Sequence, residues 1–155
     1  MSEVAVLAGV AALLFAARSS TALGAGYVGG VKVGLQLRAI NIAGHQLRDD
    51  AARAFLSMMV AAALEGVALQ VNSAFRTNEQ QQALYDAWVA FQAGTGPKAN
   101  LAAKPGFGPH QAGTAVDVES DNGRNAAFHW LTANAARFKF KRTVPSEPWH
   151  WEYFG

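Results

Sequence analysis

Two short segments near the end of the chain carry the residues with the clearest chemistry. One segment reads Gly-Pro-His-Gln-Ala-Gly-Thr-Ala-Val-Asp and contains His110 and Asp117, and the other reads Glu-Pro-Trp-His from Glu147 to His150. Two imidazoles and one carboxylate can hold a metal ion and leave one position open for water, while a second carboxylate can act as a base. The segments therefore predict a hydrolytic metal site, and the donor types favour zinc.

The position of Asp117 depends on the element that carries it. Residues 114–118 have the pattern of a strand, on which Ala115 and Asp117 share one face because side chains alternate with a period of two. Gly113 allows a turn between that strand and the loop that carries His110. An aspartate that faces inward on an apolar strand is costly unless it binds a metal or pairs with an arginine. The strand alone leaves both interpretations open.

Glu147 and His150 are three positions apart, with Pro148 between them. The proline excludes a helix interior, so this is not the helical His-Glu pair of other zinc peptidases. On an extended strand, residues three apart face opposite sides. A turn or bulge at Pro148 is therefore required if both side chains belong to one site. Taken alone, His150 is more often a structural histidine.

The rest of the sequence predicts a scaffold of helices and strands. A helix is expected up to Glu65 with Asp49 or Asp50 as its N-cap, and a capping box at Thr77–Gln80 predicts a second helix over residues 78–92. We also expect strands at 33–37, 39–42, 67–72, 138–143 and 149–153, a helix at 124–137, and a loop at 94–109. This order predicts a single-domain α+β fold, with an antiparallel sheet flanked by helices and the zinc site in a cleft on the sheet.

The first 30 residues are interpreted as a separate N-terminal segment. Val4 to Ala17 is almost wholly apolar, too short for a typical membrane span but long enough for the core of a signal peptide. Because no Lys or Arg precedes it, a secretion signal, a membrane anchor and a packed helix all stay open. The glycine-rich stretch from Gly24 to Gly34 indicates a linker. We therefore divide the chain into residues 1–30 and a main domain at residues 31–155.

Composition narrows the function classes. The chain has 155 residues, a formal net charge of +2 and no run of Lys or Arg, so nucleic acid is not an expected partner. It contains no cysteine, which excludes disulfides, thiolate ligands and a cysteine nucleophile. A domain of this length can bury a core without help from a metal, so a bound metal is more consistent with catalysis than with folding. We expect a monomer.

Three motifs taken together resemble a known family. They are Ser-Ala-Phe-Arg-Thr starting at Ser73, the segment from Pro105 to Asp117, and the segment from Glu147 to Gly155. In this order and spacing they resemble the VanY-type D-alanyl-D-alanine carboxypeptidases. That family belongs to a wider group of zinc peptidases that includes VanX-type dipeptidases and phage L-alanyl-D-glutamate endolysins. The resemblance covers residues 31–155.

The resemblance implies one Zn²⁺ ion bound by His110, Asp117 and His150, with Glu147 as the catalytic base. The implied substrates are the stem peptides of bacterial peptidoglycan. The implied location is therefore the periplasm, the cell envelope or the outside of the cell, with delivery by a phage included.

Further residues receive roles from the same resemblance. Arg76 is expected to steady the substrate or the developing oxyanion, because a guanidinium stays charged and can grip a carboxylate with two bonds. A structural salt bridge from Arg76 to Asp117 or Glu79 is the alternative. Ser73 and Gln81 are expected to help hold the carboxylate end of the substrate.

Three functions remain in competition. A D,D-carboxypeptidase removes a terminal D-Ala and needs groups that bind a free carboxylate. Arg76, Ser73 and Gln81 would supply these groups. An endopeptidase of the endolysin type cuts within the stem and needs a cleft open at both ends. A non-catalytic zinc-dependent binding module is the third class, and the retained Glu147 argues against it. The family usually has serine two residues before its first histidine, where this chain has Gly108, so the family's substrate preference is less transferable.

The remaining candidates match no motif. His45 and His129 are interpreted as surface or packing histidines. Glu119, Asp121 and Glu152 are interpreted as solvated charges, with a place at the rim of the cleft as the alternative for Glu152.

Overall fold

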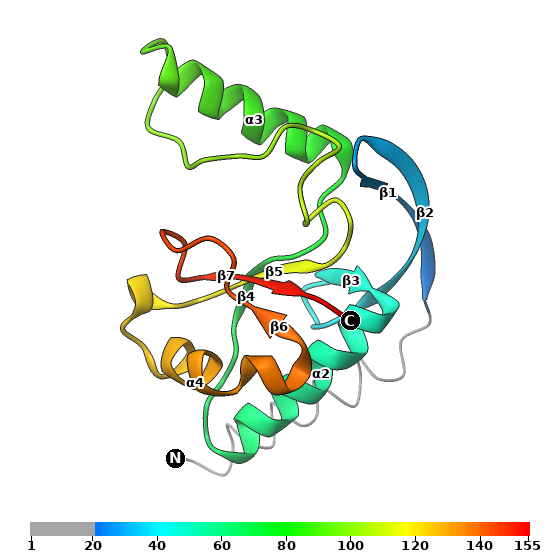
Figure 1. Ribbon diagram of the computed structural model, residues 1–155, viewed down its shortest axis with the longest axis vertical. Coiled ribbons are helices and arrows are strands. Elements are labelled where there is room, and N and C mark those ends of the chain that lie inside the picture. The colour runs from blue at the N-terminus through cyan, green and yellow to red at the C-terminus, as the bar shows by residue number, and fades with distance from the viewer. Residues whose placement is uncertain (1–20) are drawn as a thin grey trace.

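The computed structural model describes residues 21–155, so the predictions made for Val4 to Ala17 lie outside the described residues. Within these residues two antiparallel sheets lie beside three α-helices, arranged as in Figure 1. The first sheet has the order β1-β2-β3, with β1 at Ala22–Val28, β2 at Val31–Ala39 and β3 at Gln46–Arg48. The second has the order β4-β5-β7-β6, with β4 at Val71–Ser73, β5 at Ala115–Val118, β7 at His150–Tyr153 and β6 at Phe140–Lys141.

The helices are α2 at Asp49–Leu64, α3 at Asn78–Gln92 and α4 at Ala126–Asn134, with 3-10 turns η1 at Asp121–Gly123 and η2 at Ala135–Phe138. The α+β class is confirmed, although two sheets take the place of the single sheet that we expected. Within residues 21–155, the longest apolar helical stretch is too short to cross a membrane.

Helix α2 forms the centre of the hydrophobic core. Its buried side chains recur at helical spacing and are Ala51, Ala52, Phe55, Leu56, Met58 and Ala62. Phe55 is fully buried, and its ring meets that of Phe140 on β6 edge to face, with 5.8 Å between the centroids. Helices α2 and α4 lie on the same side of the second sheet (Figure 1), so the core fills the space between them and the sheet.

We expect Phe55→Ala to lower the free energy of unfolding by about 3–5 kcal/mol, because a large ring is removed from a site that cannot readily collapse. Leu64→Ala is the control on the same helix. Leu64 is 74% exposed, so its truncation should change stability by no more than about 0.5 kcal/mol. Chemical denaturation measures both changes, and equal losses would contradict this assignment of the core.

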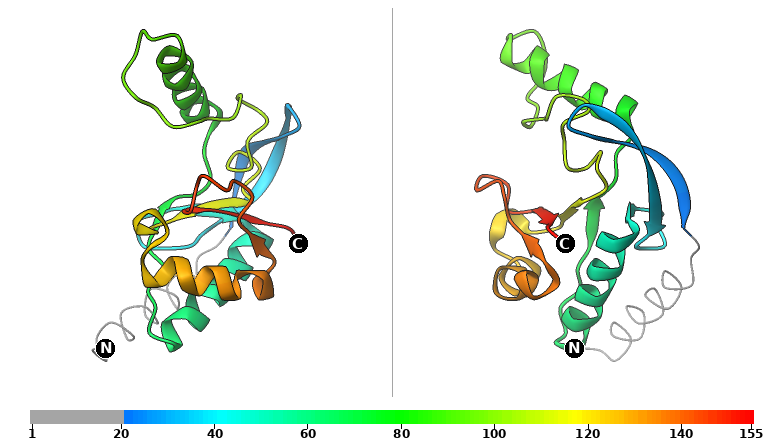
Figure 2. Two further views of the ribbon diagram at one scale, coloured as in Figure 1. Left: turned by 60° about the vertical axis from the view of Figure 1, so that its left-hand side comes forward. Right: turned by 45° about the vertical axis from the view of Figure 1, so that its right-hand side comes forward.

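Helix α3 begins where the capping box predicts. The side chain of Thr77 accepts the Gln80 backbone N–H, and the Gln80 side chain accepts the Thr77 backbone N–H. Among the residues of α3, Gln81 alone is buried. The helix projects from the rest of the molecule, and residues 93–109 run back from its end toward the second sheet (Figures 1 and 2). Helix α3 therefore extends above the second sheet instead of packing against it.

The glycine-rich stretch is not a linker. Strands β1 and β2 pair in register from Ala22↔Leu37 to Val28↔Val31, and both glycines of the connecting turn have positive φ. A Cβ added at Gly24 would collide with the Leu37 side chain, so close packing and not flexibility explains this glycine. The boundary at residue 30 stays a prediction, and it falls at the tip of this hairpin.

Other expected elements are shorter than predicted. Strand β2 ends at Ala39, and the Ile40 N–H donates to the His45 carbonyl, so residues 39–42 turn instead of forming a second strand. The strands expected at 67–72 and 138–143 are reduced to β4 and β6. The helix expected to reach Arg137 gives way to η2, and Lys139 ends that turn in the left-handed conformation.

The predicted N-cap of α2 is also wrong. The cap is Arg48, which makes no side-chain capping bond, and both Asp49 and Asp50 lie within the first turn. Acidic side chains at that place interact favourably with the positive end of the helix dipole, which is the reason that they mark the start of the helix without capping it.

Candidate metal centre

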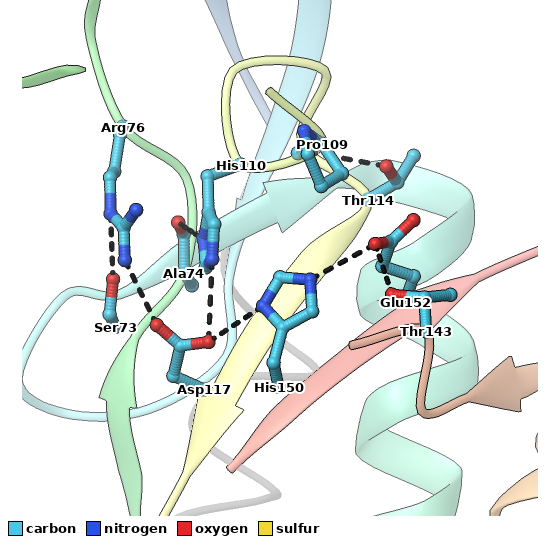
Figure 3. A network of polar contacts seen from close by, with 10 residues as sticks. All are labelled: Ser73, Ala74, Arg76, Pro109, His110, Thr114, Asp117, Thr143, His150 and Glu152. Atoms are coloured by element: carbon cyan, nitrogen blue, oxygen red, sulfur yellow. Dashed lines mark hydrogen bonds and ion pairs between the residues drawn. The ribbon is translucent and has the colours of Figure 1, made fainter. Parts of the chain in front are cut away.

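Three buried side chains from two strands and a turn meet at one point (Figure 3). Asp117 lies on β5, His150 is its direct partner on β7, and His110 lies in the turn that precedes β5. Their candidate ligand atoms all lie within 4.8 Å of one another. The fold thus brings together the three residues that the sequence proposed as ligands; we call them the His-Asp-His trio.

The local backbone explains how Asp117 reaches this place. Val116 and Val118 belong to the hydrophobic core, so the alternation along β5 turns Asp117 to the opposite face of the sheet. Gly113 has a φ of +70°, which provides the expected turn between His110 and the strand.

Both oxygens of Asp117 are engaged. Its Oδ1 lies 3.0 Å from His150 Nδ1 and 3.3 Å from His110 Nε2, while Oδ2 accepts a bond from Arg76 Nη2 at 2.9 Å. Burial by itself would raise the pKa of Asp117, but the contacts with the two histidines outweigh it and hold the pKa well below its usual range. Asp117 is therefore an ionised carboxylate that pairs with Arg76 and also faces the two imidazoles.

The two histidines are oriented by partners outside the trio. His110 Nδ1 lies 2.7 Å from the carbonyl oxygen of Ala74, which can only accept, so Nδ1 donates and Nε2 faces Asp117. His150 presents Nδ1 to Asp117, and its Nε2 lies 3.0 Å from Glu152 Oε1. Burial lowers the pKa of His150, but the hydrogen bonds to Asp117 and Glu152 outweigh it and raise the pKa. Two oriented imidazoles and one carboxylate fit the three-ligand set of a catalytic zinc ion.

The interpretation of Glu152 as a solvated charge is wrong. Its side chain is only 20% exposed, bonds to His150 and accepts a hydrogen bond from the hydroxyl of Thr143. It lines the cleft, which was the alternative interpretation. Side chains alternate along a strand with a period of two, so residues 150 and 152 must share a face. This alternation was the signal in the sequence that could have revealed the contact with His150.

We expect Glu152→Ala to weaken zinc binding by about 10–100-fold, because it removes the partner that orients His150. Glu65→Ala is the matched control, since Glu65 is exposed at the end of α2. Competition against a chelating dye measures both affinities. An unchanged affinity in Glu152→Ala would show that β7 alone holds the imidazole in place.

A turn at Pro148 brings Glu147 close to the trio. The His150 N–H donates to the Glu147 carbonyl at 3.2 Å, which closes a four-residue turn with proline at its second position. The predicted requirement for a turn is thereby met. The Glu147 side chain is half-buried and lines the same cleft, but it is not part of the trio.

Arg76 forms the salt bridge to Asp117 that the sequence left as an alternative. Its Nε also donates to Ser73 Oγ at 3.1 Å. Burial lowers the pKa of Arg76 below its usual value, and the negative charges of Asp117 and Glu147 offset only part of this effect. Ser73 lines a neighbouring hollow together with His45, and its hydroxyl is directed to Arg76 instead of the cleft. The expected contact of Ser73 with substrate therefore stays a prediction.

The cleft has a volume of about 470 Å³, which is within the range of small-ligand sites. The trio, Arg76 and Glu147 lie on its polar side. Helix α3 and the segment that follows it supply an apolar wall, made up of Leu84, Ala87, Ala99, Leu101, Ala102 and Ala103, into which Gln81 is set. His129 lies outside this site, exposed on α4.

Comparisons with known proteins agree with this geometry. Residues 44–155 match the sequence profile of the VanY family, described as D-alanyl-D-alanine carboxypeptidase. A D-alanyl-D-alanine carboxypeptidase of Enterococcus faecalis (strain ATCC 700802 / V583) is 35% identical over an alignment of 116 residues, and the match covers 61% of this chain and 43% of that protein. The chain therefore spans less than half the length of this relative.

Two solved structures share the fold. One is a mutant of the vancomycin-resistance D,D-pentapeptidase VanY from a VanB-type cassette in complex with Zn(II), with a TM-score of 0.65, 29% identity, and coverage of 78% of this chain and 79% of that one. The other is VanYB in complex with D-alanine-D-alanine, with a TM-score of 0.66, 29% identity, and coverage of 78% of each chain. Since the profile match includes the His-Asp-His trio, Glu147 and Arg76, this chain belongs to the VanY family of D-alanyl-D-alanine carboxypeptidases.

Proposed function

We propose that this chain is a zinc-dependent peptidase that removes the terminal D-Ala from peptidoglycan stem peptides, and that it works in the periplasm, the cell envelope or outside the cell. The observation that carries the proposal is the convergence of the trio within 4.8 Å in a cleft that Glu147 also lines. The Zn(II) and D-alanine-D-alanine complexes of the two structural neighbours support the choice of ion and of substrate.

The residues of the site divide the chemistry between them. His110, Asp117 and His150 would hold one zinc ion, which supplies a Lewis acid to polarise the scissile carbonyl and activate water. Glu147 accepts the proton of the attacking water and delivers it to the leaving amine. The C–N bond breaks as the acyl carbon gains a hydroxyl, so the products are a shortened stem and free D-Ala.

Arg76 contributes positive charge beside this reaction. In the described part of the chain, its bonds to Ser73 and Asp117 use two of its five N–H donors. The guanidinium can therefore hold Asp117 ionised and still offer donors to a substrate carboxylate or to the developing oxyanion. A cationic group of this kind suits a free peptide terminus better than the interior of a stem.

Mass spectrometry of the products from a defined pentapeptide stem tests the proposal. The zinc-loaded full chain should release a single D-Ala and leave a tetrapeptide. Separation of L-Ala from D-Glu would instead make the chain an endopeptidase of the endolysin type. Zinc-dependent binding of the intact stem without any cleavage would make it a binding module.

A further inference from the structure

Among residues 21–155, the cleft is lined by three carboxylates, and one of them takes no direct part in the proposed reaction. Asp117 belongs to the trio and pairs with Arg76, and Glu147 is the proposed base. Glu152 is the third. Its side chain is only 20% exposed, and no Lys or Arg side chain of the described residues pairs with it. A partly buried carboxylate without a fixed cation can bind a cationic group of a ligand.

The two oxygens of Glu152 have different surroundings. Oε1 lies 3.0 Å from His150 Nε2 and accepts a hydrogen bond from the hydroxyl of Thr143. Oε2 makes no hydrogen bond to the part of the chain that the structure describes, yet it is not among the buried side-chain atoms that lack a partner. Oε2 is therefore accessible. The contacts of Oε1 hold the side chain in place and leave the second oxygen available to a ligand.

The cation opposite Glu152 on the sheet is directed elsewhere. Lys141 on β6 is the direct partner of Glu152 on β7. Its ammonium group lies over the ring of Phe154, 5.3 Å from the centroid, and forms no ion pair with Glu152. His150 does not replace this lysine, because a histidine that binds a metal ion is neutral. The negative charge of Glu152 thus has no fixed cationic partner among the described residues when the trio holds a metal ion.

Arg76 and Glu152 lie on opposite sides of the trio (Figure 3). Arg76 bonds to Oδ2 of Asp117, whereas Glu152 contacts the ring nitrogen of His150 that does not face Asp117. The cleft therefore has a positive end and a negative end, with the trio between them. Because the proposed function places the free carboxylate of the leaving residue at Arg76, the acyl side of the peptide extends toward Glu152.

We propose that Glu152 forms a specificity subsite for an ammonium-bearing side chain of the lysine type, on the residue that precedes D-Ala-D-Ala in the substrate. This inference rests on the proposed peptidase function, and it adds a substrate contact to the role of Glu152 in orienting His150. Both D-Ala side chains end in a methyl group, so the preceding residue is the first whose side chain can carry a cation. The orienting role uses Oε1, and the subsite uses Oε2.

Val144 and Trp149 provide apolar surface for the stem of such a side chain. Both line the cleft, and Val144 directly follows Thr143, the residue that hydrogen-bonds to Glu152. A lysine packs its methylene groups along apolar surface while its ammonium group reaches a polar partner. A carboxylate at the same place would be repelled by Glu152, and a neutral side chain would gain only the apolar contact.

Three N-acetylated tripeptides test the subsite. Each ends in D-Ala-D-Ala, and the first residue is L-lysine, Nε-acetyl-L-lysine or L-norleucine. Acetyl-lysine keeps the nitrogen without its charge, and norleucine keeps the four-carbon stem. The zinc-loaded chain should cleave the lysine peptide with a KM about tenfold lower than that of either neutral peptide and with a similar kcat, because the contact is made equally in the ground and transition states. Equal KM values would overturn the subsite while leaving the peptidase function intact.

Glu152→Gln should reduce this preference in KM to within about twofold, because glutamine keeps the shape of the side chain without its charge. A purely orienting role would instead lower kcat for all three peptides alike and leave the lysine preference unchanged. Glu65→Gln is the matched control, since Glu65 is exposed at the end of α2, and it should keep the wild-type preference. A tenfold preference that persists in Glu152→Gln would refute the subsite.

Direct binding gives a readout that does not depend on turnover. Calorimetry with the zinc-loaded Glu147→Gln chain should show binding of the lysine peptide about tenfold tighter than binding of the norleucine peptide, and added salt should reduce this difference because a partly exposed ion pair is screened. If the wild-type chain cleaves none of the peptides, the peptidase proposal fails, but the dissociation constants still decide the subsite. Equal constants for the lysine and norleucine peptides would reject it.

Discussion

Glu147→Gln should lower kcat/KM on stem peptides by about 10²–10⁴-fold while the chain still binds one zinc ion. Glutamine keeps the size of the side chain but cannot take a proton from water. Because Glu147 lines the cleft without belonging to the trio, its loss should leave the ligand set complete. A coupled assay for released D-Ala measures the rate, and elemental analysis of the same sample measures the zinc.

Glu65→Gln provides the control for this result, since it makes the same chemical change at an exposed position outside the cleft. It should keep the wild-type rate. Two outcomes would contradict the assignment of Glu147. Full activity in Glu147→Gln would mean that another group is the base, and loss of zinc together with activity would place Glu147 among the ligands.

His110→Ala and His150→Ala should each reduce the zinc content from about one ion per chain to nearly none and abolish activity. Each substitution leaves two protein ligands, and a catalytic zinc site uses three. Both imidazoles are buried and point at Asp117, so no neighbouring water-exposed side chain can replace them without a change in the backbone. Elemental analysis after gel filtration at defined free zinc measures the loss.

His129→Ala is the matched histidine control, because His129 is exposed on α4 and lies outside the trio. It should retain both zinc and activity. Circular dichroism of all three variants separates loss of metal from loss of fold. A folded His110→Ala or His150→Ala variant with full zinc content would refute the proposed ligand set.

Local rules account for the parts of the structure that the sequence predicted well. The capping box at Thr77 located the start of α3, and Pro148 located the turn that joins Glu147 to His150. Both depend on contacts between residues no more than four positions apart. The alternation on β5 likewise placed Asp117 on the same face as Ala115, because the period of a strand is a property of its own backbone.

Contacts between distant residues account for what the sequence missed. The glycines of β1 indicated a flexible linker, but a Cβ at Gly26 would collide with Leu35 and lie 2.7 Å from the carbonyl oxygen of Gln111. The hairpin also donates from Tyr27 N–H to that same oxygen, so it packs against the turn that carries His110. Neither contact can be seen until β2 and residues 106–113 are placed beside β1.

The sequence by itself determined which residues are the candidate metal donors, base and cation, and in which local elements they lie, because motif spacing, capping and alternation act over a few residues. Only the tertiary structure decided which atom of each side chain faces the site. Asp117 presents one oxygen to the histidines and the other to Arg76, and Gln81 donates its side-chain N–H to the carbonyl oxygen of Ala103. These orientations follow from strand register and from hydrogen bonds between segments far apart in the chain, and a burial cost falls on every polar atom that those segments leave unpaired.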